Sequence, residues 1–388
     1  MSLPMSRSSL PARSTHPDPA QGELVPQEPP SEGSRLTADV HSLAERTGGG
    51  SEDSSEGERD SVGPNVKVKL EGEGHRFEFL GLAFKGLEIS DQPLLEPLLR
   101  ANPQPLTGFT FAALAAWNTS FRYAFHLDAR LGQLILTFAN PKTGERHLLQ
   151  PIGRISDEAT AALLEASRAL PYPLRIVGVS PPFLDAHPRI ARDFACDESR
   201  ESANYLYRTE DLAHLVGKRF SKKRNLLAQA RKLYEWQIEP LTALQQAEAC
   251  RALVQRILDE EAPEIDDSLE RELAALDFTL RHFGTLGQRG TIVRVGEELA
   301  AFSIWEANGS AMAIVHFERA LRRFKGLYQV VNQEAARSIE ALGIPLINRE
   351  EDLGEPGLRQ AKLSYQPTQL QPSLSLTLRP CAEESPLY

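Results

Sequence analysis

The 388-residue sequence predicts an α/β protein built from two domains of related architecture. The length suits two domains, and helical and strand-like patterns mix along the chain. The order of expected elements in the first half also recurs in the second: two helices, three strands in a meander, then helix, strand, helix and strand. No clear residue-level repeat accompanies this order. We therefore expect mixed, mostly antiparallel sheets flanked by helices.

Composition divides the chain further. Residues 1–74 are rich in Ser, Pro, Gly and Glu, and carry 13 acidic against 7 basic side chains. Few apolar residues there offset the entropy of ordering, so this segment is expected to be a disordered acidic tail. The predicted first domain spans residues 75–207, the second spans residues 208–380, and a short tail covers 381–388.

Elements in the first half follow from periodicity and capping residues. The segment 90–102 is typical of a helix capped by Ser90 or Asp91, and Ser156 is a matching cap for residues 156–170. The other expected helices are 109–121 and 181–190. Strand-like runs separated by turn residues are 122–128, 132–140, 145–152 and 173–179.

The second half has the same kinds of signal. Expected helices are 221–235, 242–261, 266–284, 328–343 and 357–365, and expected strands are 291–296, 298–309, 310–320, 344–348 and 372–380. Tight turns at Gly296 and Gly309 join the three strands of the meander. Gly343 is expected to end the helix that precedes the strand 344–348.

Composition also argues against several classes of protein. The three cysteines are widely spaced, and the histidines show no metal-ligand spacing, so we expect neither a disulfide framework nor a metal site. No apolar run reaches the ~18–20 residues of a membrane span, and no secretory signal is evident at the N-terminus. The expected setting is the cytoplasm, with no metal and no redox cofactor.

The segment after the strand 344–348 holds the most concentrated chemistry. Arg349, Glu350, Glu351 and Asp352 follow the strand directly, with Lys362 and Tyr365 close behind. Three consecutive acids cannot all face one pocket, so at least one is expected to be structural or solvated. In the simpler interpretation the acids form a solvated turn, Asp352 pairs with Arg349 or Arg359, and Tyr365 only packs.

A basic loop precedes the helix 328–343. Arg323, Lys325 and Gly326 stand where backbone N–H groups at a helix start bind anions. The run RFKGLY resembles the coenzyme A pyrophosphate loop of the GNAT acyltransferase superfamily, although Tyr328 replaces its last small residue. The alternative is a basic loop with an ordinary capping glycine. Asn332, on the same helix, is either a site residue or a buried amide.

A second basic segment contrasts with the net charge of −10. Five bases stand in seven residues at a helix start: Lys218, Arg219, Lys222, Lys223 and Arg224. Such a cluster can contact RNA phosphates without reading sequence, or it can be a solvated helix face. Positive charge is unfavourable at a helix N-terminus, which favours a binding partner.

Four motifs together resemble a known family: VGKRFSKKRN, the HFERA–KGLYQVVNQE region, INREEDLGEPGLRQAKLSYQP and FTFAALAAWNTSFRY. They are similar to the soluble bacterial family related to the C-terminal domain of phosphatidylglycerol lysyltransferase. The resemblance covers roughly residues 77–379. It implies two tandem GNAT-fold domains and an aminoacyl ester on tRNA as the donor.

The resemblance also implies a site between two strands that separate, one ending at Glu318 and the other being 344–348. Glu318, Glu350, Lys362 and Tyr365 are the predicted catalytic residues. The predicted donor-binding residues are Arg323, Lys325, Gly326, Asn332 and Glu351. A carboxylate can hold the donor's ammonium group or take the acceptor's proton, and Lys362 or Tyr365 can assist the departing ribose oxygen.

These expectations favour transfer of an aminoacyl group from tRNA to a lipid, peptide or small-molecule acceptor. Acyl-CoA is the alternative donor, and no DNA partner is expected. Two further alternatives are a non-catalytic module that binds an anion and an RNA-binding regulator that uses only the segment 218–224.

Overall fold

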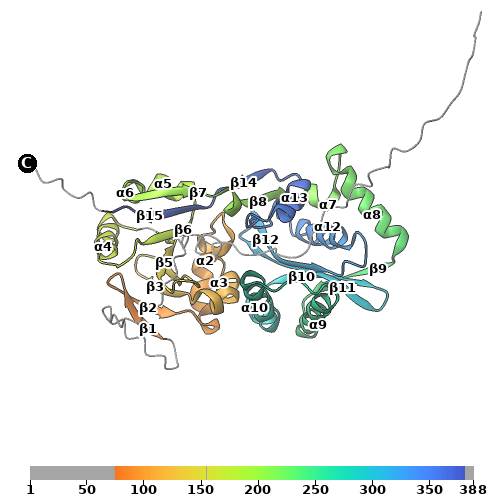
Figure 1. The fold of residues 1–388 in the computed structure, drawn as a ribbon, viewed down its shortest axis with the longest axis horizontal. Helices are drawn as coiled ribbons and strands as arrows, with labels where there is room; N and C mark the ends of the chain where they lie inside the picture. The colour runs from red at the N-terminus through yellow and green to blue at the C-terminus, as the bar shows by residue number, and fades with distance from the viewer. Residues whose placement is uncertain (1–74, 154, 381–388) are drawn as a thin grey trace, which may run out of the picture. The chain divides into compact units, whose positions relative to one another are not determined.

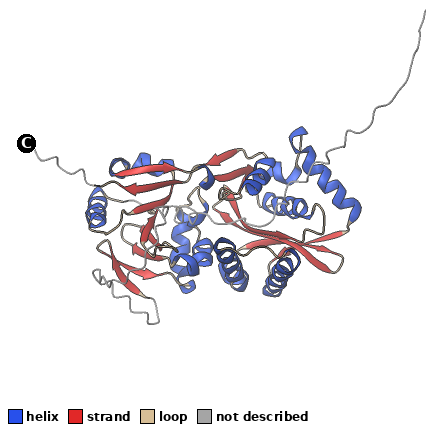
Figure 2. Ribbon diagram, in the orientation of Figure 1, coloured by secondary structure: helices blue, strands red, loops and turns tan. Residues whose placement is uncertain are grey.

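The computed structural model describes residues 75–153 and 155–380. In this part of the chain, helices flank two mixed sheets (Figures 1 and 2). The predicted fold class, an α/β arrangement of two mostly antiparallel sheets, is confirmed. The tail expected over residues 1–74 and the tail at 381–388 lie outside the described residues.

The first sheet contains eight strands in the order β1-β2-β3-β4-β5-β6-β15-β7. Only β5 and β6 pair in parallel. In that order, the strands are Arg76–Phe79, Leu82–Gly86, Ala124–Asp128, Gln133–Ala139, Arg146–Leu149, Arg175–Val179, Leu374–Leu378 and Phe194–Glu198.

The second sheet contains seven strands in the order β14-β8-β13-β12-β11-β10-β9. Only β12 and β13 pair in parallel. In that order, the strands are Gln369–Gln371, Asn204–Arg208, Leu346–Asn348, Met312–Ala320, Glu298–Asn308, Arg289–Val295 and Trp236–Leu241. Gly296 and Gly309 have positive φ at the turns of the β10–β12 meander, as expected.

The sheets exchange strands late in each half of the chain. β8 precedes the second helical region and joins β13 and β14 in the second sheet. β15 is the last described strand and inserts between β6 and β7 of the first sheet. The division at residues 207 and 208 stays a prediction, and the two sheets do not follow it at these strands.

The helices of the first half are α2 Gln92–Ala101, α3 Phe111–Phe121, α4 Asp157–Arg168, α5 Pro181–Ala186 and α6 Pro188–Asp193. Ser156 caps α4 by accepting from the Ala159 N–H at 3.1 Å, as predicted. The single helix expected over residues 181–190 is wrong, because the chain leaves the helical conformation at His187. The next residue is Pro188, and proline disfavours a helical backbone in the residue before it.

The helices of the second half are α7 Thr209–His214, α8 Ser221–Leu233, α9 Leu244–Glu261, α10 Asp267–Arg281, α11 Phe283–Leu286, α12 Leu327–Glu340 and α13 Pro356–Ser364. α12 packs on β10, β11 and β12, and also contacts α7 and α8. α9 contacts β11, and Figure 1 shows it across the sheet from α12. α12 ends at Glu340, three residues before the expected Gly343.

The largest hydrophobic cluster joins both sheets and their helices. It includes Trp117 of α3, Phe317 of β12 and Val331 of α12. All nine residues of β12 are buried, and His316, Glu318 and Arg319 are among them. Buried charged groups require polar partners, so a cluster of polar side chains is expected around this strand. Such a cluster is a candidate functional site. In the described part of the chain, no helix has the length and apolar character to cross a membrane.

Candidate functional site

The site lies where β12 and β13 stop pairing. The two strands run parallel over three residue pairs, ending at Ile314 and Asn348. β12 continues to Ala320, but the segment that follows β13 stops pairing with it after Asn348. Side chains beyond this point therefore belong to two segments whose backbones no longer pair.

The turn after β13 is held in an unusual backbone conformation. Glu350 has φ +59°, which costs a non-glycine residue on the order of 1–3 kcal/mol. Its N–H donates to Asn348 Oδ1 at 2.8 Å, and its carbonyl accepts from the Tyr205 N–H at 3.0 Å. The Asn348 amide in turn donates to Asn204 Oδ1 at 2.9 Å. Strand β8 thus fixes where the Glu350 side chain begins.

The acidic segment is buried rather than solvated. Arg349, Glu350, Glu351 and Asp352 are 6%, 3%, 1% and 0% exposed. The interpretation of this segment as a solvated turn is therefore wrong, because β8 and α13 cover it.

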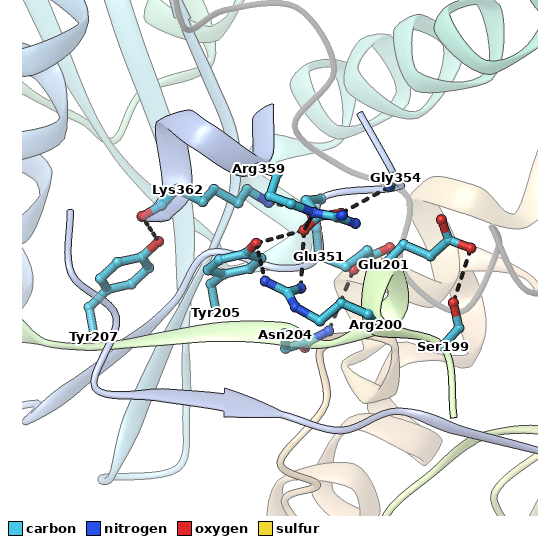
Figure 3. A network of polar contacts seen from close by, with 11 residues as sticks. Ser199, Arg200, Glu201, Asn204, Tyr205, Tyr207, Glu351, Gly354, Arg359 and Lys362 are labelled. Carbon is cyan, nitrogen blue, oxygen red and sulfur yellow. Dashed lines mark hydrogen bonds and ion pairs between the residues drawn. The ribbon is translucent and has the colours of Figure 1, made fainter. Parts of the chain in front are cut away.

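Asp352 is the structural member of this segment. Its carboxylate accepts two bonds of 2.8 Å from Arg359, one of 3.1 Å from Arg200 and one of 2.6 Å from the Tyr205 hydroxyl. Figure 3 shows Arg200, Tyr205 and Arg359 close together, and Arg200 also donates to the Tyr205 hydroxyl at 2.8 Å. Burial alone raises the pKa of Asp352, but these bonds outweigh it and the pKa is lowered. The pairing with Arg359 is confirmed, whereas Arg349 lies elsewhere.

Lys362 of α13 is 1% exposed and reaches back to the same segment. Its ammonium group donates to the Glu351 carbonyl, and its own carbonyl accepts from the Tyr207 hydroxyl at 2.8 Å (Figure 3). Burial lowers the pKa of Lys362 to about 8, although the nearby charges of Glu351 and Glu350 act in the opposite direction. A buried lysine with this pKa can donate or accept a proton near neutral pH.

Glu318 of β12 joins three elements. Its two carboxylate oxygens accept from Asn332 of α12 and from Arg349, each at 3.3 Å. Asn332 is 4% exposed, so it is a buried amide that also lies at the predicted site. The structure therefore brings Glu318, Asn332, Glu350 and the residues around Lys362 into one buried region.

Tyr365 is packed between cations. The Lys223 ammonium lies 3.9 Å from its ring centroid, and the Arg349 guanidinium carbon lies 5.1 Å away. Lys223, which the sequence groups with the phosphate-binding bases, is 6% exposed. It therefore faces the interior beside Tyr365, a placement that the run of basic residues does not predict.

The remaining bases of that segment differ among themselves. Arg219 pairs with Asp211 at 2.5 Å, and Arg224 donates to the carbonyls of Leu215 and Gly217, each at 2.6 Å. Both arginines are therefore compensated within the chain, so their charge does not by itself indicate a binding partner. Lys218 and Lys222 are exposed and remain the predicted phosphate contacts of this segment.

The basic loop before α12 engages the chain itself. Arg323 bonds to Glu260 and Glu298, and the Lys325 N–H donates to the Tyr234 hydroxyl at 3.3 Å. Gly326 has φ +84°, and a Cβ there meets the Leu226 carbonyl oxygen at 2.8 Å. The close approach of α8 therefore explains this glycine, while donor binding at the loop stays a prediction.

Two residues of the site were absent from the predictions. His316 Nδ1 lies 3.0 Å from Glu350 Oε1, and His316 Nε2 lies 2.7 Å from Glu306 Oε1. His316 stands two residues before Glu318 on β12, at a β-bulge: Phe317 pairs with Ile304 and Val315 pairs with Trp305, so His316 has no partner in the ladder. A histidine and a glutamate this close together in a buried strand are the signal that identifies His316. Within the described residues, no group of three His, Cys, Asp or Glu side chains is arranged to hold a metal ion.

The fold combines two mixed sheets with a buried polar site where β12 and β13 stop pairing, and a comparison with protein families identifies the family. The family described as "Phosphatidylglycerol lysyltransferase, C-terminal" matches residues 103–374, so the chain belongs to it. The match includes every residue of the β12–β13 site described above. The resemblance inferred from the motifs is thus confirmed.

Solved structures agree with this assignment. A conserved protein of unknown function from Bacteroides thetaiotaomicron is 27% identical, covering 76% of this chain and 99% of that chain, with a TM-score of 0.70. The C-terminal domain of a putative lysylphosphatidylglycerol synthetase from Agrobacterium fabrum is 13% identical, covering 75% and 92%, with a TM-score of 0.53.

L-PGS from Bacillus licheniformis is 12% identical to this chain, covering 74% and 91%, with a TM-score of 0.51. At 12–13% identity, this structure and the Agrobacterium domain share the fold with this chain, and their activities are not transferred to it. The comparison with curated proteins found no match.

Proposed function

We propose that this protein transfers an aminoacyl group from aminoacyl-tRNA to a lipid, peptide or small-molecule acceptor. The observation that carries the proposal is the buried cluster at the end of β13. There Lys362, with its pKa lowered to about 8, lies near Glu350, Glu351 and Arg349. Arg349 in turn donates to Glu318. Family membership supports the same class of reaction.

The reaction requires three tasks. The acceptor's nucleophilic atom attacks the carbonyl carbon of the aminoacyl ester, and the bond from that carbon to the ribose oxygen breaks. The acceptor loses one proton and the ribose oxygen gains one, so the step balances. A carboxylate of the cluster takes the first proton, and the Lys362 ammonium supplies the second. Another carboxylate holds the ammonium group of the donor.

Contacts of the basic loop favour tRNA over acyl-CoA as the donor. Arg323 is engaged by two glutamates, and the backbone at Lys325 and Gly326 faces Tyr234 and α8. A pyrophosphate at this loop has to replace those contacts. By contrast, Lys218 and Lys222 are exposed at the start of α8, whose Lys223 contacts Tyr365 in the site. This helix therefore links an RNA-facing surface with the reacting groups.

A donor test on the full-length purified protein examines the proposal. Labelled mixed aminoacyl-tRNA and, separately, labelled acetyl-CoA are incubated with phosphatidylglycerol vesicles and a bacterial metabolite extract. We expect label to leave tRNA, and Lys362→Met to slow this by about 100-fold or more. The matched control is Lys232→Met, because Lys232 is an exposed lysine in the last turn of α8.

The other outcomes separate the alternatives. Label that leaves acetyl-CoA, and not tRNA, rejects the proposal in favour of acyl-CoA chemistry. Label that stays on tRNA while the protein still binds it indicates an RNA-binding module without transfer. If Lys362 acts as an ammonium acid, the rate also falls as the pH rises through about 8, because the proton is then lost.

A further inference from the structure

A chain of buried and partly buried polar side chains runs from α3 to the acidic segment after β13. Thr110, the N-cap residue of α3, donates to Glu306 Oε1 at 2.6 Å. The same oxygen lies 2.7 Å from His316 Nε2, and His316 Nδ1 lies 3.0 Å from Glu350 Oε1. The chain therefore connects β11, β12 and the segment after β13 through one imidazole ring.

The geometry specifies the charge of that ring. An ionised carboxylate only accepts hydrogen bonds, and a neutral imidazole has a single N–H. Both ring nitrogens of His316 face a carboxylate oxygen, so both must carry a proton if both carboxylates are ionised. His316 is 4% exposed, which leaves little access for water to replace either partner.

The surrounding charges favour the same protonation state. Burial alone lowers the pKa of His316, but the hydrogen bonds and charges of Glu306 and Glu350 outweigh burial and raise it to about 10. Glu306 is further held by the Thr110 hydroxyl, close to the positive end of the α3 dipole. On the other side, the charge of Glu350 also acts on the buried Lys362.

We propose that His316 is a positioning residue: an imidazolium, held in its charged form by Glu306, that keeps Glu350 ionised and aimed at the ammonium group of the donor. The imidazolium and its two carboxylates together carry one net negative charge, which suits a ligand with one positive charge. The assignment of the ligand rests on the proposed function, whereas the clamp on Glu350 does not.

His147 provides a matched control in the same chain. It is 2% exposed, and burial followed by the charge of Arg175 lowers its pKa to about 4. The two histidines are similarly buried but have different partners: the Arg175 N–H donates to His147 Nδ1 at 3.3 Å, and the Glu145 carboxylate lies 3.8 Å from His147 Nε2. Their ring-nitrogen signals, recorded together in one sample, are expected to differ throughout the neutral range.

The first experiment is NMR of the full chain with isotope-labelled histidine, from about pH 6 to about pH 9. His316 is assigned by the loss of its signals in His316→Gln. We expect both ring nitrogens of His316 to be protonated throughout, while His147 stays neutral. Glu306→Gln is expected to make His316 lose a proton within this range. A neutral His316 ring in the unaltered protein at about pH 7 overturns the proposal.

A second measurement tests Glu350 directly. Carboxyl-labelled glutamate, assigned with Glu350→Gln, is expected to show that Glu350 takes up a proton at a higher pH in His316→Gln than in the unaltered protein. An unchanged Glu350 titration overturns the clamp. Because neither NMR measurement uses a donor, failure of the proposed function leaves both results interpretable.

Kinetics then test the link to the donor. If the donor is aminoacyl-tRNA, His316→Gln is expected to reduce kcat/KM by about 10- to 100-fold, mainly through KM. Glu306→Gln leaves both His316 and Glu350 in place, and it is expected to reduce kcat/KM by a smaller factor, again mainly through KM. Unchanged KM in both variants overturns the positioning role. Absence of transfer by the unaltered protein instead contradicts the proposed function.

Discussion

Asp352→Asn gives the sharpest test of how the acidic segment is held. In the structure, Asp352 Oδ2 accepts from Arg359, Arg200 and Tyr205, and Oδ1 accepts from Arg359 and the Gly354 N–H. Asparagine keeps one oxygen and replaces the other with an amide that only donates. Even if the amide replaces Oδ1, two accepting contacts are lost.

The magnitude follows from these contacts. A hydrogen bond to a charged group contributes about 1.5–3 kcal/mol, so two lost bonds correspond to about 3–6 kcal/mol. The side chains of Arg200 and Arg359 are 41% and 36% exposed and can turn toward water, which recovers part of this. We therefore expect Asp352→Asn to lower the free energy of unfolding by about 2–4 kcal/mol near pH 7.

The pH dependence supplies an independent check. Because the folded-state pKa of Asp352 is lowered, its contribution is present above the unfolded value of about 3.9 and is lost as the pH falls through the folded value. The difference between the unaltered protein and the variant should therefore narrow below about pH 4. Urea unfolding, followed by tryptophan fluorescence at several pH values, measures this difference.

Asp277→Asn is the matched control. Asp277 also accepts from two arginines, Arg251 at 2.7 Å and Arg281 at 2.6 Å, but its side chain is 43% exposed. Its replacement is expected to cost less than about 1 kcal/mol. Equal losses in the two variants, or a loss in Asp352→Asn that does not change on acidification, refute the reasoning.

Three further predictions concern stability and use the same unfolding assay. Gly326→Ala should destabilise by about 1–3 kcal/mol, because φ is +84° and the new Cβ meets the Leu226 carbonyl; an unchanged midpoint contradicts this. Thr110→Val should lower the free energy of unfolding by about 1 kcal/mol through loss of the α3 cap, whereas Thr110→Ser should leave it unchanged. Arg319→Met should cost about 3–5 kcal/mol by leaving Glu272 buried without its arginine, and adding Glu272→Gln should recover part of that loss.

Much of the fold and part of the candidate site were predictable from the sequence. The β10–β12 meander follows from glycine turns between apolar runs, and Ser156 was identified as a cap from its local pattern. Glu318 and Lys362 were grouped through motifs, and the structure places both in the buried region at the end of β13. Such features depend on a few neighbouring residues, or on motifs that the family shares.

Other features depend on which distant segments meet. The exchange of β8 and β15 between the sheets is a matter of strand pairing, and local periodicity carries no information about a strand's partner. The burial of Lys223 follows from the packing of α8 beside Tyr365, although five bases in seven residues are typical of an exposed face.

The sequence by itself determined where most helices and strands form, because caps, turns and apolar periodicity act over a few residues. Only the tertiary structure decided that Glu306, His316 and Glu350 form one hydrogen-bonded chain. Those residues come from β11, β12 and the segment after β13. Their contact depends on strand register and on the left-handed turn at Glu350. Both must be accurate, because the donor–acceptor distance of a hydrogen bond varies by only a few tenths of an ångström.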